Sequence, residues 1–194
     1  MNQTDVDRLY DDAFYRKREL YRHEYRCFAY WLRDRYHPAD VVELGSGAGY
    51  LLCWLAEKAT VLGVEGSRAA FPYIPPTVPT LWFDLRHAPD LNPLIRPGWD
   101  LAVSIETVEH LPPENEAGFL ETLACLSDTI FLTAGQTGGS PKHLNARPKP
   151  YWVSRMEALG FRLDAEATND FTRDCRAGDC AWVVDNAMIF LRDE

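Results

Sequence analysis

Long apolar runs are missing from this chain of 194 residues, since none approaches the roughly 20 residues that a helix needs to cross a bilayer. The first residues, M-N-Q-T-D-V-D, also lack the basic and apolar regions of a signal peptide. We therefore expect a soluble, cytoplasmic protein without a membrane partner. Internal repeats and low-complexity segments are absent as well, and the length suits a single domain, residues 1–194.

Cysteine pairs and positive charge are also scarce. The five cysteines have scattered spacings, and the pair in C-R-A-G-D-C, residues 175–180, has no second Cys/His pair at zinc-finger spacing. A reduced compartment and no metal site are expected. The 20 Lys and Arg residues are outnumbered by 29 Asp and Glu, which gives a net charge of −9. This balance argues against a general nucleic-acid binder, because such a protein needs a basic face.

Short apolar runs alternate with helical patterns along the rest of the chain. The runs predict strands at residues 41–44, 61–65, 80–85, 100–105, 129–134, 161–165 and 187–191. Helices are predicted at residues 50–58, 114–126 and 151–159. Strands that alternate with helices form a mostly parallel sheet with helices on both faces. We therefore predict an α/β fold with a seven-stranded sheet, in which the last two strands form an antiparallel hairpin with a loop between them.

Residues 1–38 are predicted to form a helical extension in front of a core of residues 39–194. Aromatic residues and leucines recur there at near-helical intervals, which predicts one or two amphipathic helices that end before Pro38. Three interpretations of these aromatic side chains stay open: a lid over a ligand pocket, core packing, or the surface of a homodimer.

The stretch V-V-E-L-G-S-G-A-G-Y places Gly45, Gly47 and Gly49 directly after the first predicted strand. Ligands of open parallel sheets bind at the carboxyl ends of the strands, where glycine lets a ligand approach the backbone. A plain strand-to-helix turn is the competing interpretation. Glu65 favours the ligand site, because it ends the second strand 20 residues after Gly45, the spacing at which dinucleotide-binding folds place an acid on ribose hydroxyls.

A second carboxylate follows the third predicted strand. Asp84, in F-D-L, can accept a hydrogen bond from an exocyclic amino group while the Leu85 backbone N–H donates to a ring nitrogen, a pattern that recognises adenine. An NAD enzyme is the main competing interpretation of the glycine turn. The dinucleotide pattern is G-x-G-x-x-G, however, whereas the third glycine here comes one residue earlier.

These segments, with V-L-G-V-E-G-S and W-D-L-A-V-S-I-E-T-V-E-H-L, resemble Rossmann-like S-adenosylmethionine-dependent methyltransferases in order and spacing from Val41 to Leu132. The resemblance implies the Rossmann-like methyltransferase fold and S-adenosyl-L-methionine as the cofactor. It places cofactor contacts at the ends of four strands: Glu43, Gly45, Gly47 and Gly49 at the methionine end, Glu65 at the ribose, Asp84 and Leu85 at the adenine, Ile105 and Glu106 behind it, and Ser46 and Gly66 in the same turns.

The segment from Leu132 to Trp152 is similar to a subgroup of small methyltransferases that have a Gly-rich loop, then His-x-Asn, then a Tyr-Trp at the start of a helix. The resemblance extends to most of the chain but brings no substrate with it. From this segment, Asn145 and Tyr151 are expected to bind the substrate.

Methyl transfer to a hydroxyl or an ammonium group requires a base near the carboxyl edge of the sheet. His143, in the loop after the fifth strand, and His110, which follows Glu109, are the two catalytic candidates. Packing within the turn is the alternative for His110. The basic residues around His143, namely Lys142, Arg147 and Lys149, indicate either an anionic acceptor or ordinary solvated charges.

The sequence thus predicts an enzyme that transfers a methyl group from S-adenosylmethionine to an oxygen or nitrogen of a small-molecule or sugar-like acceptor. Methylation of a macromolecule and a non-catalytic, cofactor-binding partner protein are the alternatives. The acidic balance weighs against nucleic acid, and no Asn/Asp-Pro-Pro-Tyr motif follows the fourth strand.

Overall fold

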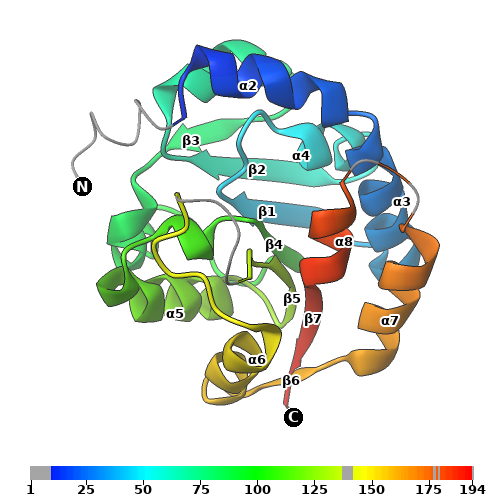
Figure 1. The fold of residues 1–194 in the computed structure, drawn as a ribbon, viewed down its shortest axis with the longest axis vertical. Coiled ribbons are helices and arrows are strands. Elements are labelled where there is room, and N and C mark those ends of the chain that lie inside the picture. The colour runs from blue at the N-terminus through cyan, green and yellow to red at the C-terminus, as the bar shows by residue number, and fades with distance from the viewer. Residues whose placement is uncertain (1–9, 137–141, 177, 179, 194) are drawn as a thin grey trace.

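The computed structural model describes residues 10–136, 142–176, 178 and 180–193. One seven-stranded sheet has the order β3-β2-β1-β4-β5-β7-β6 (Figure 1). The strands are β1 (Asp40–Leu44), β2 (Thr60–Glu65), β3 (Thr80–Trp82), β4 (Leu101–Ile105), β5 (Thr129–Thr133), β6 (Phe161–Leu163) and β7 (Ala187–Arg192). The pairs from β3 to β5 are parallel, whereas β7 is antiparallel to both β5 and β6. This confirms the predicted α/β fold with a mostly parallel sheet.

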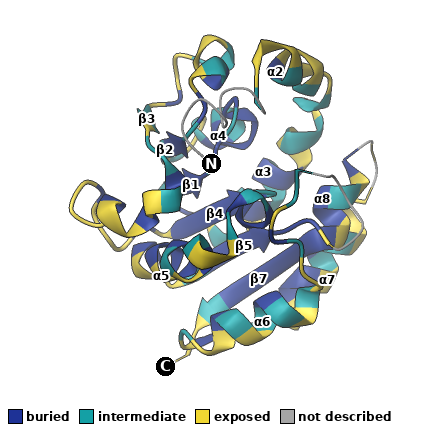
Figure 2. Cartoon of the chain, turned by 60° about the vertical axis from the view of Figure 1, so that its left-hand side comes forward, coloured by how far each residue is buried: buried dark blue, intermediate teal, exposed yellow. Residues whose placement is uncertain are grey.

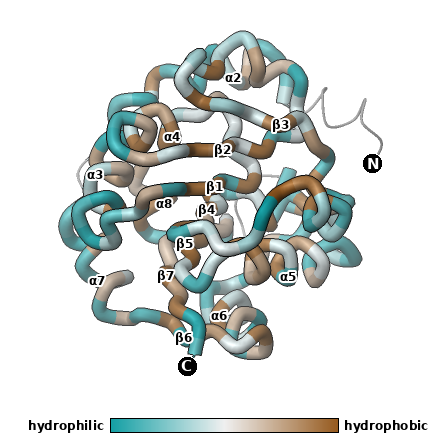
Figure 3. The backbone as a smooth tube through the Cα atoms, turned by 180° about the vertical axis from the view of Figure 1, so that it is seen from behind, coloured by the Kyte–Doolittle hydropathy of each residue, from teal (hydrophilic) through white to brown (hydrophobic). Residues whose placement is uncertain are grey.

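The middle of the sheet is apolar on both faces because successive strand residues point to opposite sides. In β1, Val41 packs with one group of helices and Val42 with the other. Burial is concentrated in the strands (Figure 2), and apolar stretches follow strands such as β2 and β7 (Figure 3). After β3 the chain crosses back to place β4 beside β1, so the strand order reverses between these two strands. Such a switch point opens a crevice at the carboxyl ends of the strands.

Helices cover both faces of the sheet. One face packs against α3 (Glu24–Tyr36), α4 (Tyr50–Leu55), α7 (Ala165–Asp174) and α8 (Ala181–Asn186). The other packs against α5 (Glu116–Leu126) and α6 (Lys149–Glu157), where the fully buried Trp152 fills the core. In the N-terminal region, α2 (Asp12–Arg18) lies beside the carboxyl edge, while Phe28 and Leu32 of α3 belong to the core. Of the residues described, none forms a helix with the length and hydrophobicity that crossing a membrane demands.

The last two strands pair antiparallel as predicted. The predicted loop between them is wrong, because α7 and α8 connect the two strands. The physical reason is visible in the sequence: Ala167, Phe171 and Cys175 recur four residues apart and are all buried. Asp164 caps α7 by accepting a hydrogen bond from the Ala167 backbone N–H at 3.0 Å. The sequence 165–174 therefore carries a helical pattern with a start signal.

Candidate cofactor and acceptor site

A cavity of about 680 Å³ opens at the carboxyl ends of β1, β2 and β4. Its size lies within the range of about 300–1,000 Å³ that holds drug-sized ligands. The predicted residues that line it are Glu43, Gly45, Ser46, Gly47, Glu65, Gly66, Asp84, Leu85, Ile105, Glu106, His110 and His143. The structure therefore brings together at one cavity most residues that the sequence assigned to a cofactor or to catalysis, and their roles there stay predictions.

The turn between β1 and α4 needs glycine for conformation and for space. Gly45 has φ +81°, and a Cβ built on it would lie 2.6 Å from Thr107 Cγ2 and closer still to the Thr107 hydroxyl. Its backbone N–H donates to the Val64 carbonyl at 2.8 Å, which holds the turn against β2. Gly49 has φ +70° directly before α4 and is outside the cavity lining. Gly45 therefore lets the β1–α4 turn and the β4 loop approach closely.

Glu65 links the glycine turn to the end of β2. Its carboxylate accepts hydrogen bonds from the backbone N–H groups of Gly47 at 2.8 Å and Ser67 at 2.6 Å, and from the Tyr15 hydroxyl at 3.4 Å. Burial raises the pKa of Glu65 despite these hydrogen bonds, which favour its charged form. The side chain is thus fixed at the cavity wall. A ligand hydroxyl that binds Glu65 would share its oxygens with these donors or displace the Tyr15 hydroxyl, whose contact is the longest of the three.

Glu43 and Ser46, at the end of β1 and in the turn after it, each bring an unpaired buried polar atom to the cavity wall, as far as the described residues go. Glu43 Oε2 and Ser46 Oγ make no hydrogen bond to any described residue. Burial, and secondarily the charge of Glu65, holds the pKa of Glu43 well above its ordinary value. Buried polar atoms are nearly always paired in folded proteins, so these two groups are suited to a polar ligand that enters the cavity.

Asp84 begins the 3-10 helix η3 (Leu85–Leu91), where it accepts from the Arg86 backbone N–H at 3.0 Å. Its carboxylate also pairs with the Arg86 guanidinium. Burial acts to raise the pKa of Asp84, but the hydrogen bonds from Arg86 outweigh it and hold the value below the ordinary one. Asp84 is therefore an anchored carboxylate at the cavity edge, with the buried Leu85 beside it.

Glu106 follows β4 in an unusual backbone conformation, with φ +48°. Its Oε1 accepts from the Thr133 hydroxyl at 2.8 Å and from the Asn186 side chain at 3.1 Å. Left-handed conformations of residues other than glycine occur mainly where the surroundings enforce them, often at functional sites. Here β5 and α8 hold the carboxylate between β4 and the cavity, and burial raises its pKa.

His110 and His143 meet on the side of the cavity that follows β4 and β5, where their ring centroids are 4.7 Å apart. Burial, followed by the neighbouring His143, lowers the pKa of His110 to about 4. Burial also lowers the pKa of His143. Glu109, next to His110 in the chain, is fully buried. Burial and the charge of Glu106 hold the pKa of Glu109 well above its ordinary value. At neutral pH both imidazoles are therefore uncharged.

Asn145 and Tyr151, which the sequence assigned to substrate binding, are outside the cavity lining. The Asn145 side chain donates to Glu116 Oε2 at 2.6 Å, and the Tyr151 hydroxyl donates to Glu116 Oε1 at 2.8 Å. Arg147 in turn donates to Asn145 Oδ1 at 3.1 Å. In this structure these side chains hold the first turn of α6 and the segment before it against Glu116 of α5. The Gly-rich part of the predicted loop, residues 137–141, lies outside the described residues.

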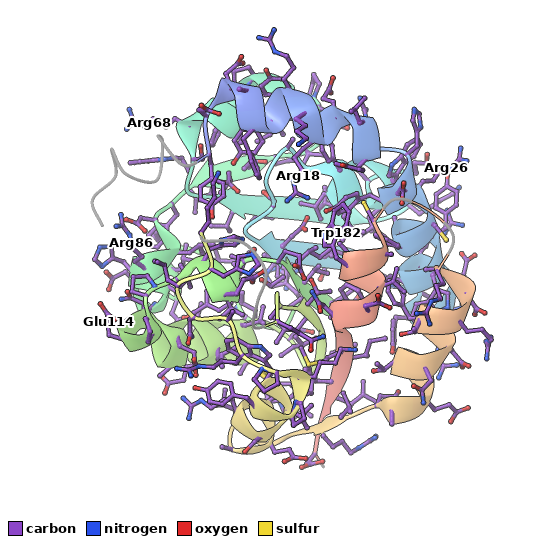
Figure 4. The ribbon with its side chains drawn as sticks, viewed as in Figure 1. Arg18, Arg26, Arg68, Arg86, Glu114 and Trp182 are labelled. Atoms are coloured by element: carbon purple, nitrogen blue, oxygen red, sulfur yellow. The ribbon has the colours of Figure 1, made fainter. Side chains whose placement is uncertain are left out.

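The sequence did not single out Arg18 and Trp182 as cavity residues, although the N-terminal aromatic side chains were one candidate for a lid. Figure 4 shows Arg18 of α2 and Trp182 of α8 pointing toward each other, and the guanidinium carbon lies 5.6 Å from the indole centroid. The other aromatic lining residues are Tyr10, Phe14, Tyr15 and Tyr25 from the N-terminal region and Tyr50 of α4. Of the three basic residues predicted near an anionic acceptor, only Lys142 lines the cavity. The homodimer through the N-terminal helices stays a prediction.

No protein-family model matches the sequence, and no curated protein matches it. Solved structures match its fold over nearly all of the chain. Magnesium protoporphyrin IX methyltransferase from Synechocystis PCC 6803 with bound SAH superposes with a TM-score of 0.68 at 17% identity, covering 99% of this chain and 100% of the other. CalS10, a SAM-bound amino pentose methyltransferase from Micromonospora echinaspora, superposes with a TM-score of 0.65 at 12% identity, covering 87% of this chain and 92% of the other. A TehB-like SAM-dependent methyltransferase from Corynebacterium glutamicum superposes with a TM-score of 0.61 at 16% identity, covering 86% of this chain and 88% of the other.

These similarities show that the chain has the Rossmann-like fold of class I methyltransferases, as the sequence predicted. At such identities they establish the fold alone.

Proposed function

We propose that this protein transfers the methyl group of S-adenosylmethionine to an oxygen or nitrogen of a small-molecule acceptor, sugar-like metabolites included. The observation that carries the proposal is the meeting of Glu43, Glu65 and Asp84 around one cavity, at the edge of the sheet where the glycine turn lies. The fold, which methyltransferases from Synechocystis and Micromonospora share, supports the same activity.

The residues at the cavity fit this cofactor. The unpartnered Glu43 Oε2 suits the ammonium group at the methionine end, since a buried carboxylate is stabilised by a cation. Glu65 and Asp84 carry the ribose and adenine contacts, respectively. Ile105, which is buried, supplies an apolar wall. Each contact uses a group whose place is fixed by backbone hydrogen bonds or by strand pairing.

In methyl transfer, a lone pair of the acceptor attacks the methyl carbon and the carbon–sulfur electron pair returns to sulfur, so the cofactor leaves as an uncharged thioether. A hydroxyl or ammonium acceptor also gives up a proton. His110 and His143 line the acceptor side and are the candidate proton acceptors. The protein otherwise aligns the two reactants and excludes water.

The acceptor side combines aromatic surface with positive charge. Phe14 and Trp182 each lie against the Arg18 guanidinium, at 5.1 and 5.6 Å from the ring centroids. Lys142 Nζ lies 5.3 Å from the Tyr10 ring centroid. This wall favours a flat or ring-shaped acceptor that carries a negative group, because aromatic faces stack on rings while the cations attract the charge.

The test uses S-adenosylmethionine with a labelled methyl group, incubated with the protein and a metabolite extract that is then fractionated by size. We expect label in the small-molecule fraction, and its loss in the Glu65→Gln variant. Label confined to protein or nucleic acid would transfer the assignment to a macromolecular substrate. Absence of label in every fraction, with the cofactor bound, would favour a non-catalytic binding protein.

A further inference from the structure

We propose that Glu109, His110 and His143 form a binding site for one divalent transition-metal ion at the acceptor side of the cavity. The potential ligand atoms of the three residues lie within 4.8 Å of one another. Glu109 and His110 belong to the 3-10 helix η4 (Val108–His110) after β4, and His143 comes from the segment after β5. The cysteine spacings argue against a structural zinc site built on cysteines, and they have no bearing on these three residues.

Glu109 is the anchor of this trio. Its side chain is fully buried, and its Oε1 accepts a hydrogen bond from the Gly135 backbone N–H at 2.9 Å. Its Oε2 has no hydrogen-bond partner among the described residues. A buried carboxylate oxygen without a partner is costly, and a bound cation removes the cost.

Each histidine places a ring nitrogen within 4.8 Å of a Glu109 carboxylate oxygen. His110 Nδ1 lies 3.2 Å from the Lys142 carbonyl oxygen, which can only accept, so Nδ1 carries the proton. The lone pair is then on His110 Nε2, which lies 3.9 Å from Glu109 Oε1. His143 Nδ1 is buried without a hydrogen-bond partner in the described part of the chain. Metal-bound histidines commonly donate their second ring N–H to a carbonyl in the way that His110 does.

The absence of a side chain at Gly135 lets His143 and Glu109 come close to each other. A Cβ built on Gly135 would lie 2.5 Å from His143 Cε1 and 3.0 Å from Glu109 Oε1, so any other residue there would push the two ligands apart. The Asn145 backbone N–H donates to the Glu109 carbonyl at 2.9 Å, which ties the His143 segment to η4. The Glu109 and His110 side chains are therefore held by hydrogen bonds, and the backbone bond of Asn145 holds the His143 segment beside them.

Two imidazole nitrogens and one carboxylate oxygen suit Zn²⁺, Co²⁺, Fe²⁺ or Mn²⁺ better than Mg²⁺, which prefers oxygen ligands. Ligand atoms on one tetrahedral ion lie about 3.3 Å apart, so a shift of less than ~1 Å per side chain closes the site. The carboxyl of Glu106 adjoins Glu109, and the two side chains share a hydrogen bond when Glu109 is protonated; a bound cation would take the place of that proton. The nearby cations Arg18 and Lys142 lie against aromatic rings.

Three protein ligands leave at least one coordination position open. Since His110 and His143 line the cavity, the open position faces the space of the acceptor. The ion would there bind an oxygen of the acceptor, such as a hydroxyl or carboxylate, and the two histidines would hold the ion instead of accepting a proton. This role rests on the proposed function, whereas metal binding itself does not.

The experiment titrates the chelator-treated, cofactor-free protein with Co²⁺, followed by visible absorption, and with Zn²⁺, followed by calorimetry. We expect one ion per chain, and an affinity at least ten-fold lower in Glu109→Gln and in His143→Ala. The control is His23→Ala, which removes an exposed histidine outside the cavity lining and leaves the affinity unchanged. Because Glu109→Gln alters a buried group, His143→Ala in a half-buried segment keeps the test valid if Glu109→Gln fails to fold.

No saturable binding, or equal affinity in the wild type and a folded His143→Ala, overturns the metal site. S-adenosylhomocysteine binding is measured on the same samples without metal. Metal binding without S-adenosylhomocysteine binding would keep the metal site and reject the proposed function. The reverse result would reject the metal site and leave the histidines as candidate bases.

Discussion

Replacing Gly45 with alanine tests the packing of the glycine turn against the loop after β4. Gly45 and Gly160 both have φ +81°, but a Cβ on Gly45 would meet Thr107 at 2.6 Å or less, whereas nothing lies within 4 Å of a Cβ on Gly160. The left-handed conformation costs alanine about 1–2 kcal/mol at either position. Overpacking adds about 1–3 kcal/mol, and it applies only to Gly45. Gly160→Ala is thus a matched control for the conformational part.

We expect Gly45→Ala to lower the free energy of unfolding by about 2–5 kcal/mol and Gly160→Ala by about 1–2 kcal/mol, measured by urea denaturation. Adding Thr107→Gly to Gly45→Ala removes the clashing side chain. The double variant is therefore expected to recover at least about 1 kcal/mol as coupling energy. Equal destabilisation by the two alanine variants, or no coupling with Thr107, would refute the close approach of the turn to the β4 loop.

Three further predictions concern the carboxyl groups of Glu65 and Glu43 and the hydrogen bonds from Tyr151 to Glu116. Glu65→Gln removes the charge that accepts hydrogen bonds from two backbone N–H groups, and calorimetry should show S-adenosylhomocysteine affinity lowered about ten- to hundred-fold, since a charged hydrogen bond contributes about 1.5–3 kcal/mol. Because the pKa of Glu43 is raised in the folded state, the contribution of this carboxyl to stability falls as pH rises above the unfolded value of about 4.3. Glu43→Gln removes that fall, so urea denaturation should show the stability of the variant relative to the wild type increasing from about pH 4.5 upward; a difference that does not change with pH would contradict it. Tyr151→Phe, which loses hydrogen bonds to Glu116, should cost about 1 kcal/mol of stability and leave S-adenosylhomocysteine affinity unchanged; a large affinity loss would place Tyr151 in the site after all.

The side of the cavity lined by Glu43, Glu65 and Asp84 could be predicted because it is formed by strand ends. Parallel strands bring their carboxyl ends to one edge, so Glu43, Glu65 and Asp84 had to lie near one another once the strands were assigned. Their positions require only the strand pattern and the order of strands. The sheet order and the cavity agree with that reasoning.

The acceptor side depends on side-chain directions that no local pattern encodes. Asn145 and Tyr151 sit in the expected segment, yet both turn toward Glu116 of α5, far from them in the sequence. Conversely, Arg18 and Trp182 line the cavity from opposite ends of the chain. The aromatic residues near Arg18 did indicate a lid among other interpretations, but only the packed structure brings α2 and α8 together.

The connection between β6 and β7 was predictable in principle. Ala167, Phe171 and Cys175 show the four-residue spacing of a buried helical face, and Asp164 gives its start signal. Reading the end of the chain as a simple hairpin overlooked this pattern. The metal candidates, by contrast, combine Glu109 with the distant His143, and their convergence requires the pairing of β4 with β5.

The most direct test of the central claim is a calorimetric titration of the purified chain with S-adenosylhomocysteine and, separately, with NAD. We predict saturable binding of S-adenosylhomocysteine at one site per chain, weakened in Glu65→Gln, and no binding of NAD. Binding of NAD without S-adenosylhomocysteine would contradict the proposed methyl transfer.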